Sequence, residues 1–217
     1  IFDISHQYEI EIKSLLGNAD NASRLRYQIS KPGGKLLTKG RQLNHYFILS
    51  DASELEQKLE PYISESKEDL FRKIINEGKD LSVRTRNTDG EVKFVIKASI
   101  GYDTSSNGVS RMEFEDNISM TLDELDKLLL GAGLQYQAKW SREREEYKLK
   151  DVNICLDRNA GYGYLAEFEK VVPDQSLVDS VKRELIEIMN SFNVAELKQD
   201  RLERMFEYYN NNWRDYY

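Results

Sequence analysis

Acidic and basic side chains alternate along several short segments of the chain, and the first segment shows the pattern most simply. There Glu9, Glu11 and Lys13 occupy every second position, separated by Ile10 and Ile12. Side chains two residues apart point to the same face of a strand, so the three charges would share one face. A pattern this short is expected about once by chance in a chain of this composition, so only the complete, ordered set of such segments is informative.

The same spacing recurs along the sequence with carboxylates and with cations. The carboxylates on such faces are Glu9, Glu11, Glu113, Glu115, Asp157, Glu167 and Glu169. The cations are Lys13, Arg84, Arg86, Lys97, Arg111, Arg142 and Arg144. A solvated strand face explains any one segment, but it explains less well why the charged positions are almost all carboxylate or guanidinium.

This set of charges favours metal and phosphate chemistry. Seven carboxylates in one enclosure repel one another unless cations neutralise them. One cysteine and two histidines cannot build a Cys/His zinc site, so we expect oxygen ligands and Mg²⁺ or Mn²⁺, with enough carboxylates for two ions. Arginine suits phosphate oxygens through bidentate contacts, and a triphosphate carries enough negative charge to match several such side chains.

Strands must position these side chains. Alternation of apolar and charged residues predicts strands at 8–13, 81–86, 92–97, 111–115, 152–157 and 165–169. Weaker patterns at 35–41, 46–49 and 139–149 bring the expected number to eight or nine. The faces opposite the charges consist of Ile, Val, Phe, Leu and Met, as a packed core requires.

Helix signals lie between the predicted strands. Asp20 precedes a short predicted helix that the segment Pro32-Gly33-Gly34 terminates. Thr121 and Glu124 form a capping box at the start of a predicted helix over 121–130. The other predicted helices are two within 51–80, on either side of Pro61, and single helices at 176–192 and 194–209.

An antiparallel sheet that closes on itself would turn the charged faces inward, provided that helices cover its apolar exterior. The sequence therefore predicts an α+β fold, a closed antiparallel eight-stranded β-barrel (a tunnel) with a charged lumen and helices packed on the outside. No internal repeat or Pro/Gly-rich linker divides the chain, so one domain over 1–217 is predicted, with a helical insertion at about 51–80 and a C-terminal helix at about 194–209.

Composition limits the partners and the location. The net charge of −7 over 217 residues argues against a general binder of nucleic acids or anionic membranes, and no sequence-specific nucleic-acid partner is expected. No segment approaches the roughly 18 apolar residues of a spanning helix, and the start lacks the features of a signal peptide. We therefore expect a cytoplasmic protein without a membrane partner, and the oligomeric state stays open.

Taken in order, the charged segments resemble the CYTH superfamily. These are the triphosphate tunnel metalloenzymes, which include class IV adenylate cyclases, thiamine triphosphatases and inorganic triphosphatases. The resemblance spans nearly the whole chain. It rests on Glu9-x-Glu11-x-Lys13, Arg84-x-Arg86, Lys97, Arg111-x-Glu113-x-Glu115, Arg142-x-Arg144-x-x-Tyr147, Asp157, Gly161-x-Gly163 and Glu167-x-Glu169.

The resemblance also implies individual roles. It implies that Glu9, Glu11 and Glu169 hold a first metal ion, and that Glu113, Glu115 and Asp157 lie nearer a second, with Glu167 also among the metal-binding residues. The catalytic residues that it predicts are Lys13, Arg84, Arg86 and Lys97. The predicted substrate-binding residues are these four together with Arg111, Arg142 and Arg144.

The chain departs from the family pattern in three places. In the segment from Gln42 to Tyr46, Asn44 stands where the family often has Asp. Arg142 stands where Lys is frequent. The segment 51–80 is longer than in compact members, so no role is transferred to it.

Three functions fit this pattern. The first is a metal-dependent triphosphatase that releases orthophosphate from an inorganic or organic triphosphate, with tripolyphosphate at least as good a substrate as ATP because no adenine pocket is expected. The second is a class IV adenylate cyclase, but those cyclases resemble one another in a His-Phe pair that is replaced here by Asp3 and Ile4. The third is a non-catalytic sensor of polyphosphates or nucleotides, for which so many carboxylates would be unnecessary.

The remaining noteworthy residues have plainer interpretations. His6 and His45 are expected to be structural or superficial. Gly161 and Gly163 are expected to form a turn. The C-terminal aromatic residues are expected to pack on the barrel in preference to forming a base-stacking surface; they are Tyr208, Tyr209, Trp213, Tyr216 and Tyr217. A phosphate-binding role and a solvated strand face are equally expected for Lys35, Lys39 and Arg41.

Overall fold

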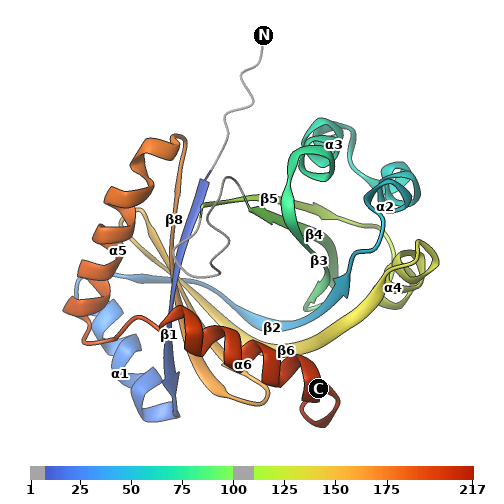
Figure 1. Ribbon diagram of the computed structural model, residues 1–217. Helices are drawn as coiled ribbons and strands as arrows, with labels where there is room; N and C mark the ends of the chain where they lie inside the picture. Colours follow the sequence, from blue (N-terminus) through green and yellow to red (C-terminus); the bar gives the residue numbers. More distant parts are fainter. Residues whose placement is uncertain (1–7, 100–109) are drawn as a thin grey trace.

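The computed structural model of the protein describes residues 8–99 and 110–217. Eight antiparallel strands follow one another in the order β1-β5-β4-β3-β2-β6-β7-β8 and curve around a central space (Figure 1). The strands are β1 (Tyr8–Gly17), β2 (Lys35–Ile48), β3 (Lys79–Thr88), β4 (Glu91–Ser99), β5 (Ser110–Asn117), β6 (Gln135–Leu149), β7 (Val152–Asn159) and β8 (Gly163–Val172).

Strand β1 pairs with both the second and the last strand in this order, β5 and β8, so the sheet comes back to its first strand. One edge of β1 pairs with β8 along most of its length. Within the described residues, the other edge pairs with β5 at two positions, Glu9 with Arg111 and Ile10 with Ser110. The predicted eight-stranded antiparallel sheet is confirmed, and the return of the ring to its first strand depends on these two pairs.

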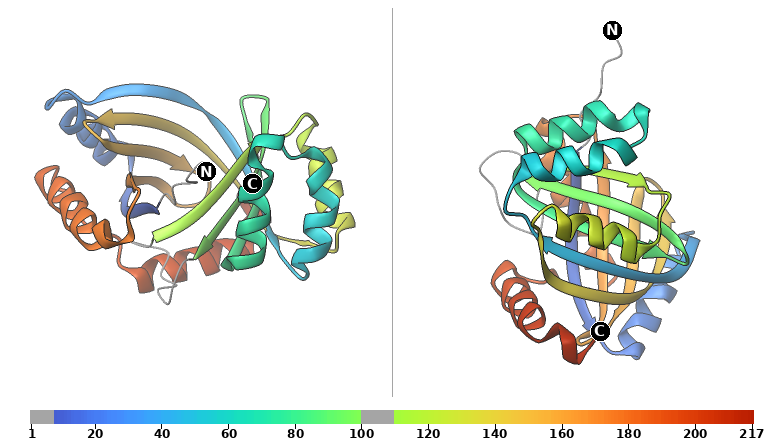
Figure 2. Two further views of the ribbon diagram at one scale, coloured as in Figure 1. Left: turned by 90° about the horizontal axis from the view of Figure 1, so that it is seen from above. Right: turned by 90° about the vertical axis from the view of Figure 1, so that its right-hand side faces the viewer.

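Helices surround the ring of strands, as predicted. They are α1 (Ala19–Ser30), α2 (Ala52–Leu59), α3 (Glu68–Glu77), α4 (Leu122–Gly131), α5 (Val178–Ser191) and α6 (Gln199–Asn212). Helices α2, α3 and α4 lie on the β3–β5 side, while α1 and α5 lie on the side of β1 and β8 (Figure 2). Helix α6 crosses the front of the ring in the view of Figure 1.

The hydrophobic cores lie between the sheet and these helices, outside the ring. In β4, Phe94 and Ile96 are fully buried in the core that includes Phe71 of α3, and the Phe71 and Phe94 rings are 6.3 Å apart. Burying each such side chain contributes about 1.5–3 kcal/mol. The alternate residues Lys93 and Lys97 therefore face the inside of the ring.

Two strands are longer than the sequence pattern suggests. The weak patterns at 35–41 and 46–49 belong to the single strand β2, because the intervening residues continue the ladder with β6. Strand β6 likewise begins at Gln135, earlier than the predicted residue 139. These long strands pair with each other and form the broad wall that carries Arg142 and Arg144.

Local signals at the helix ends are partly as predicted. Thr121 and Glu124 form the predicted capping box. The prediction that Asp20 precedes α1 is wrong: Asp20 lies in the first turn, and the side chain of Asn18 accepts a hydrogen bond of 2.9 Å from the backbone N–H of Asn21. Asn18 is therefore the N-cap of this helix.

The last helix begins later than predicted. Helix α6 starts at Gln199, whereas the apolar pattern predicted a start at residue 194. The backbone N–H of Leu197 donates to the carbonyl oxygen of Lys13 at 2.7 Å, and the Leu197 side chain packs with Leu165 and Leu202. These contacts with the sheet hold the preceding segment out of the helix.

The connection between β7 and β8 is the turn that the two glycines predict. Gly161 has φ +92° and Gly163 has φ +79°, both in the left-handed region that favours glycine. A Cβ atom on Gly163 would collide with the carbonyl oxygen of Gly17, so a larger residue would also force β1 and β8 apart.

None of the helices within residues 8–99 and 110–217 combines the length and the apolar character that crossing a membrane requires.

Candidate active site

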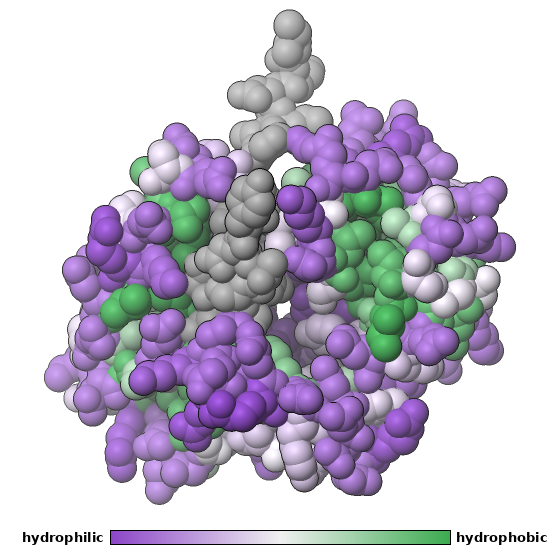
Figure 3. All heavy atoms as spheres, viewed as in Figure 1, coloured by the Kyte–Doolittle hydropathy of each residue, from purple (hydrophilic) through white to green (hydrophobic). Residues whose placement is uncertain are grey.

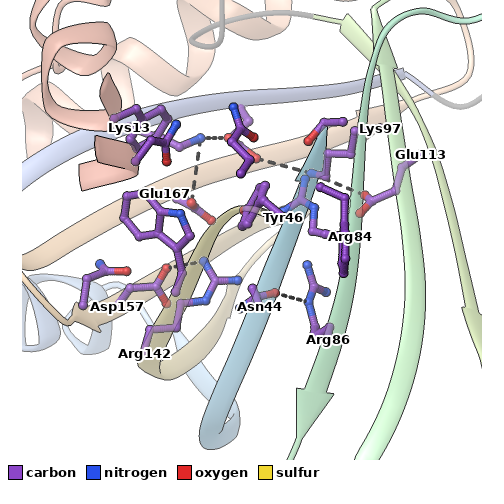
Figure 4. A pocket seen from close by; sticks show the side chains of 18 of the residues that line it. Lys13, Asn44, Tyr46, Arg84, Arg86, Lys97, Glu113, Arg142, Asp157 and Glu167 are labelled. Carbon is purple, nitrogen blue, oxygen red and sulfur yellow. Dashed lines mark hydrogen bonds and ion pairs between the residues drawn. The ribbon is translucent and has the colours of Figure 1, made fainter. Parts of the chain in front are cut away.

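The inner faces of the strands surround a cavity of about 790 Å³ (Figure 4). A hollow with hydrophilic side chains around it opens on the face shown in Figure 3. Arg111 lies opposite Glu9 in the β1–β5 pairing, but its side chain is outside the described part of the structure. The predicted site residues that line the cavity are Glu9, Glu11, Lys13, Arg84, Arg86, Lys97, Glu113, Glu115, Arg142, Arg144, Asp157, Glu167 and Glu169.

Three carboxylates meet where β1 and β8 pair. Glu11 lies directly opposite Glu169, and Glu9 precedes Glu11 on the same face of β1. One carboxylate oxygen from each of the three lies within 4.8 Å of the others. Oxygen donors gathered in this way fit a divalent cation such as Mg²⁺ or Mn²⁺.

Lys97 of β4 contacts this acidic cluster. Its Nζ donates to both oxygens of Glu9, at 2.8 and 3.1 Å, and lies 3.7 Å from Glu11 and 3.5 Å from Glu113. Burial raises the pKa of Glu9, but the charge of Lys97 and a hydrogen bond with Glu113 outweigh it and lower the pKa to about 2. Glu9 is therefore ionised at neutral pH.

Two other carboxyl groups have pKa values shifted in the opposite direction. Burial, together with the nearby negative charge of Glu9, raises the pKa of Glu113 to about 7 although Lys97 opposes the shift. Burial and Glu9 likewise raise the pKa of Glu169 to about 7. Glu169 forms no ion pair with a described residue. The unpaired negative charge here would be relieved either by a proton or by a metal ion.

A second acidic centre lies across the cavity and is already neutralised by arginine. Asp157 is fully buried; it accepts hydrogen bonds from Arg142 Nη1 at 3.0 Å and from Arg144 Nε at 2.7 Å. Arg144 also contacts Glu167. Burial lowers the pKa of Arg144, but Asp157 and Glu167 outweigh it and raise the pKa well above its ordinary value. Arg144 is thus a fixed positive charge.

Arg86 donates hydrogen bonds to two polar side chains and lies near other cationic side chains. Its Nε donates to Asn44 Oδ1 at 2.8 Å, and its Nη1 donates to Glu115 Oε2 at 3.0 Å. Burial and the charges of Arg84 and Arg142 lower the pKa of Arg86 to about 10. Such mutual repulsion favours the arrival of an anion among the three guanidinium groups.

Arg84 retains an unused donor. Its Nη1 donates to the hydroxyl of Tyr46 at 2.8 Å, whereas its Nε is buried and has no hydrogen-bond partner in the structure described. A buried N–H without a partner is costly, so Arg84 is prepared for an acceptor that enters the cavity.

The carboxylates predicted for a second metal ion do not form a second cluster. Within the described residues, Glu9, Glu11 and Glu169 are the one group of three acidic side chains close enough to share an ion. Glu115 accepts hydrogen bonds from arginine and lysine, and Asp157 accepts them from two arginines. The geometry thus separates a metal-binding side of the cavity from a side where carboxylates position arginine.

Sequence reasoning missed one wall of the cavity. Trp140 of β6 and Phe206 and Asn210 of α6 line it, together with Tyr162. Trp140 could have been found, because it lies two residues before Arg142 in an alternating strand and so shares its face. The contribution of α6 depends on how the helix packs on the sheet, and the sequence carries no direct signal of that.

His45 is structural, as expected, and is separate from the cavity. Its Nδ1 is 2.6 Å from Asp126 of α4, and its Nε2 is 2.7 Å from the hydroxyl of Tyr217. Tyr136 and Thr85 also donate to Asp126, at 2.6 and 2.7 Å. This buried network joins β2, β3, β6 and α4. His6 lies outside the described residues.

The basic residues at the start of β2 are exposed. Arg41 is 83 % exposed along its side chain, and Lys39 contacts Glu145 at 3.1 Å on the outside of the ring. None of Lys35, Lys39 and Arg41 lines the cavity formed by the described residues. Of the two roles expected for these three residues, the solvated strand face is therefore the one that fits the structure.

The C-terminal aromatic residues pack only in part as expected, because Tyr216 and Tyr217 are 38 and 44 % exposed. Tyr209 is 2 % exposed and stacks on Trp140, with ring centroids 3.6 Å apart. Tyr208 remains 60 % exposed. The packing of Tyr209 fixes the position of α6 against the sheet.

Comparison with known proteins agrees with this architecture. A model of the CYTH domain family matches residues 71–201. A search of curated protein sequences finds no match.

Several solved structures share the fold. The PH1819 protein from Pyrococcus horikoshii OT3 is 22% identical, with a TM-score of 0.63 over 88% of this chain and 94% of that one. A conserved hypothetical protein from Pyrococcus furiosus is 15% identical, with a TM-score of 0.63 over 89% and 93%. A "putative adenylate cyclase" from Vibrio parahaemolyticus is 15% identical, with a TM-score of 0.61 over 88% and 94%. At these identities the likeness shows the fold alone.

Proposed function

Because the chain belongs to the CYTH domain family, we propose that it is a metal-dependent triphosphatase that releases orthophosphate from a triphosphate bound inside the ring of strands. One observation carries this proposal: the cavity contains uncompensated groups of both signs. Arg84 Nε is buried without a partner, and Glu169 forms no ion pair among the described residues. A complex of a divalent cation with a triphosphate would satisfy both groups at once.

The acidic cluster supplies the cation site. A divalent ion fits between Glu9, Glu11 and Glu169 because their carboxylate oxygens lie close together. The raised pKa of Glu169 indicates a site where positive charge is favoured. The bound divalent ion would act as a Lewis acid that neutralises charge on phosphate oxygens. Lys97 keeps Glu9 ionised and oriented by donating to both of its oxygens.

The arginine side of the cavity supplies the anion site. Arg84 and Arg86 extend inward from β3 and Arg142 extends from β6, so the three guanidinium groups would bind oxygens of the phosphate chain. Arg144 is already bonded to Asp157 and Glu167, and we assign it a positioning role. Phosphoryl transfer depends mainly on positioning and charge stabilisation, so this arrangement needs no side-chain nucleophile.

A second ion would need Glu113. Of the carboxylates predicted for that ion, Glu115 and Asp157 already accept hydrogen bonds from arginine. Glu113 has a pKa of about 7 and contacts Lys97 at 3.5 Å, so a second ion could replace its proton near neutral pH. We therefore propose that the substrate supplies most of the second ion's ligands.

A class IV adenylate cyclase is the second candidate, and the wall that contains Trp140 favours it. A cyclase must hold base and sugar so that the 3′-hydroxyl is in line with the α-phosphate. Trp140 and Phe206 offer aromatic surface for such contacts. The positions that argue against a cyclase, Asp3 and Ile4, are outside the described residues.

Product analysis separates the candidates. The protein is incubated with Mg²⁺ or Mn²⁺ and with ATP, tripolyphosphate or thiamine triphosphate, and phosphate, pyrophosphate and cyclic AMP are resolved. Orthophosphate with ADP supports the triphosphatase. Pyrophosphate with cyclic AMP, and no release from tripolyphosphate, supports the cyclase. Binding without turnover of any of the three supports the sensor. Glu11→Gln, which preserves volume but removes a ligand charge, is the control for divalent dependence.

A further inference from the structure

We propose that the wall formed by Trp140, Phe206 and Asn210 binds the base of a nucleoside triphosphate, whose phosphates lie in the arginine-lined part of the same cavity. The inference rests on the proposed function and names its substrate class. It replaces the sequence-based expectation that the site lacks a place for adenine.

Trp140 lies one step away from the proposed phosphate site. It precedes Arg142 by two residues on β6 and shares its inward face, which places the side chains about 7 Å apart along the strand. The centroid of the Trp140 ring is also 6.4 Å from that of Tyr46, whose hydroxyl accepts a hydrogen bond from Arg84. A triphosphate held by Arg84 and Arg142 would therefore direct the group attached to its phosphate chain toward Trp140.

The indole is held rigidly in this position. Tyr209 stacks on one of its faces at 3.6 Å with an interplanar angle of 22°, and the Tyr209 hydroxyl donates to the carbonyl oxygen of Lys139 at 2.8 Å. Phe206 and Tyr162 contact it edge-on at 5.6 and 5.5 Å. An aromatic surface fixed before the ligand arrives loses little conformational entropy on binding, which favours affinity.

Uncharged amides line the same cavity as this aromatic surface. Asn210, Gln137 and Asn159 all line the cavity. Asn159 Nδ2 is buried and has no hydrogen-bond partner in the described structure. An amide offers both donors and acceptors, which matches the mixed hydrogen-bonding edge of a nucleobase.

These observations favour a nucleobase over the other groups that can be attached to a triphosphate, and over an inorganic triphosphate. An inorganic polyphosphate would not be stabilised by an aromatic surface, since its oxygens need cations and N–H donors. A cationic ring would favour a free carboxylate beside the aromatic groups, whereas Asp157 and Glu167 in this lining are already bound by Arg144. Stacking on aromatic side chains combined with amide hydrogen bonds is how proteins hold unpaired bases.

Tryptophan fluorescence tests this site directly. The chain has two tryptophans, Trp140 and Trp213, so a Trp213→Phe variant reports on Trp140 alone. This variant is titrated in EDTA with a β,γ-imido nucleoside triphosphate and, separately, with tripolyphosphate. We expect a saturable change in emission with the nucleotide and a much smaller change with tripolyphosphate, which should nevertheless displace the nucleotide. Equal changes with both ligands, or no change on nucleotide binding that calorimetry detects, would overturn the proposal.

A pair of matched variants on α6 gives a second readout. Phe206→Leu removes an aromatic residue of the wall, whereas Tyr208→Leu removes an exposed aromatic residue of the same helix. With Phe206→Leu we expect the ratio of kcat/KM for ATP to that for tripolyphosphate to fall about 10-fold, in the range that one stacking contact provides. With Tyr208→Leu the ratio should stay within twofold. Equal ratios in both variants, or thiamine triphosphate as the preferred substrate, would contradict a nucleobase site.

The two experiments also separate this inference from the proposed function. Hydrolysis of tripolyphosphate without a nucleotide-specific effect at Trp140 or Phe206 overturns the base site and leaves the triphosphatase intact. Nucleotide-specific changes at Trp140 without hydrolysis of any triphosphate support the base site and overturn the triphosphatase.

Discussion

Arg84 and Tyr46 lie opposite each other in the pairing of β2 and β3, and Arg84 Nη1 donates to the Tyr46 hydroxyl at 2.8 Å. This bond fixes the guanidinium group inside the cavity, while Nε is buried and has no hydrogen-bond partner among the described residues. The arrangement costs the folded protein a hydrogen bond that a bound anion can restore.

We therefore predict that Arg84→Ala weakens tripolyphosphate binding more than pyrophosphate binding. Each charge-assisted hydrogen bond is worth about 1.5–3 kcal/mol, so the loss for tripolyphosphate should be about 10- to 100-fold. Isothermal titration calorimetry with both anions measures this difference. Arg41→Ala is the control, since the Arg41 side chain is 83 % exposed and does not line the cavity formed by the described residues. Equal losses for the two anions in Arg84→Ala would indicate general electrostatics and no shaped anion site.

The pKa of Glu169 predicts a pH dependence of stability in the metal-free protein. Its value rises from 4.5 to about 7 on folding, mainly through burial. Between these values the folded protein holds a proton that the unfolded chain has released, so the contribution of Glu169 falls as pH rises from about 4.5 to 7 and then levels off. Glu169→Gln should therefore gain stability relative to the natural protein across this window.

Thermal unfolding in EDTA at pH 5, 6, 7 and 8 checks this prediction. The difference in Tm between Glu169→Gln and the unmodified chain should grow up to pH 7 and then remain constant. Glu187→Gln, at an exposed position of α5, should show no such trend. A constant difference for Glu169→Gln at all four pH values would show that the carboxyl group is not perturbed.

Asp126 is predicted to stabilise the fold without taking part in binding. It accepts hydrogen bonds from Tyr136 and Thr85 and contacts His45, and all of these contacts lie outside the cavity. Asp126→Ala leaves several buried polar groups without partners, which should lower the free energy of unfolding by roughly 3 kcal/mol or more.

Chemical denaturation measures this loss, with Asp123→Ala on the exposed face of α4 as the control. The folded fraction of Asp126→Ala should still bind tripolyphosphate with unchanged affinity. A loss of less than 1 kcal/mol would mean that water replaces the carboxylate in the network.

The faces of the strands were predictable from sequence because alternation depends on local geometry alone. Glu9, Glu11 and Lys13 line the cavity as their spacing predicts, and Phe94 and Ile96 pack outward. The extent of pairing was less predictable, since the continuity of β2 through its middle depends on its neighbours β3 and β6.

Residue type alone could not predict which carboxylates bind arginine and which are free to bind a metal ion. Asp157 and Glu169 are both acidic side chains on inward faces, yet Asp157 is neutralised by two arginines and Glu169 by none within the described residues. Register and strand order set this difference. Phe206 and Asn210 were missed for a similar reason, because their approach to the cavity follows from the packing of α6.

We propose above all that the cavity binds a divalent cation and a triphosphate together. Calorimetric titration with a β,γ-imido nucleoside triphosphate, in Mn²⁺ and in EDTA, tests it most directly. We predict at least about 10-fold tighter binding in Mn²⁺, because each ligand neutralises the charge that opposes the other, and loss of this difference in Glu11→Gln. Equal affinity in Mn²⁺ and EDTA, or a Glu11→Gln variant that retains the full difference, would contradict the claim.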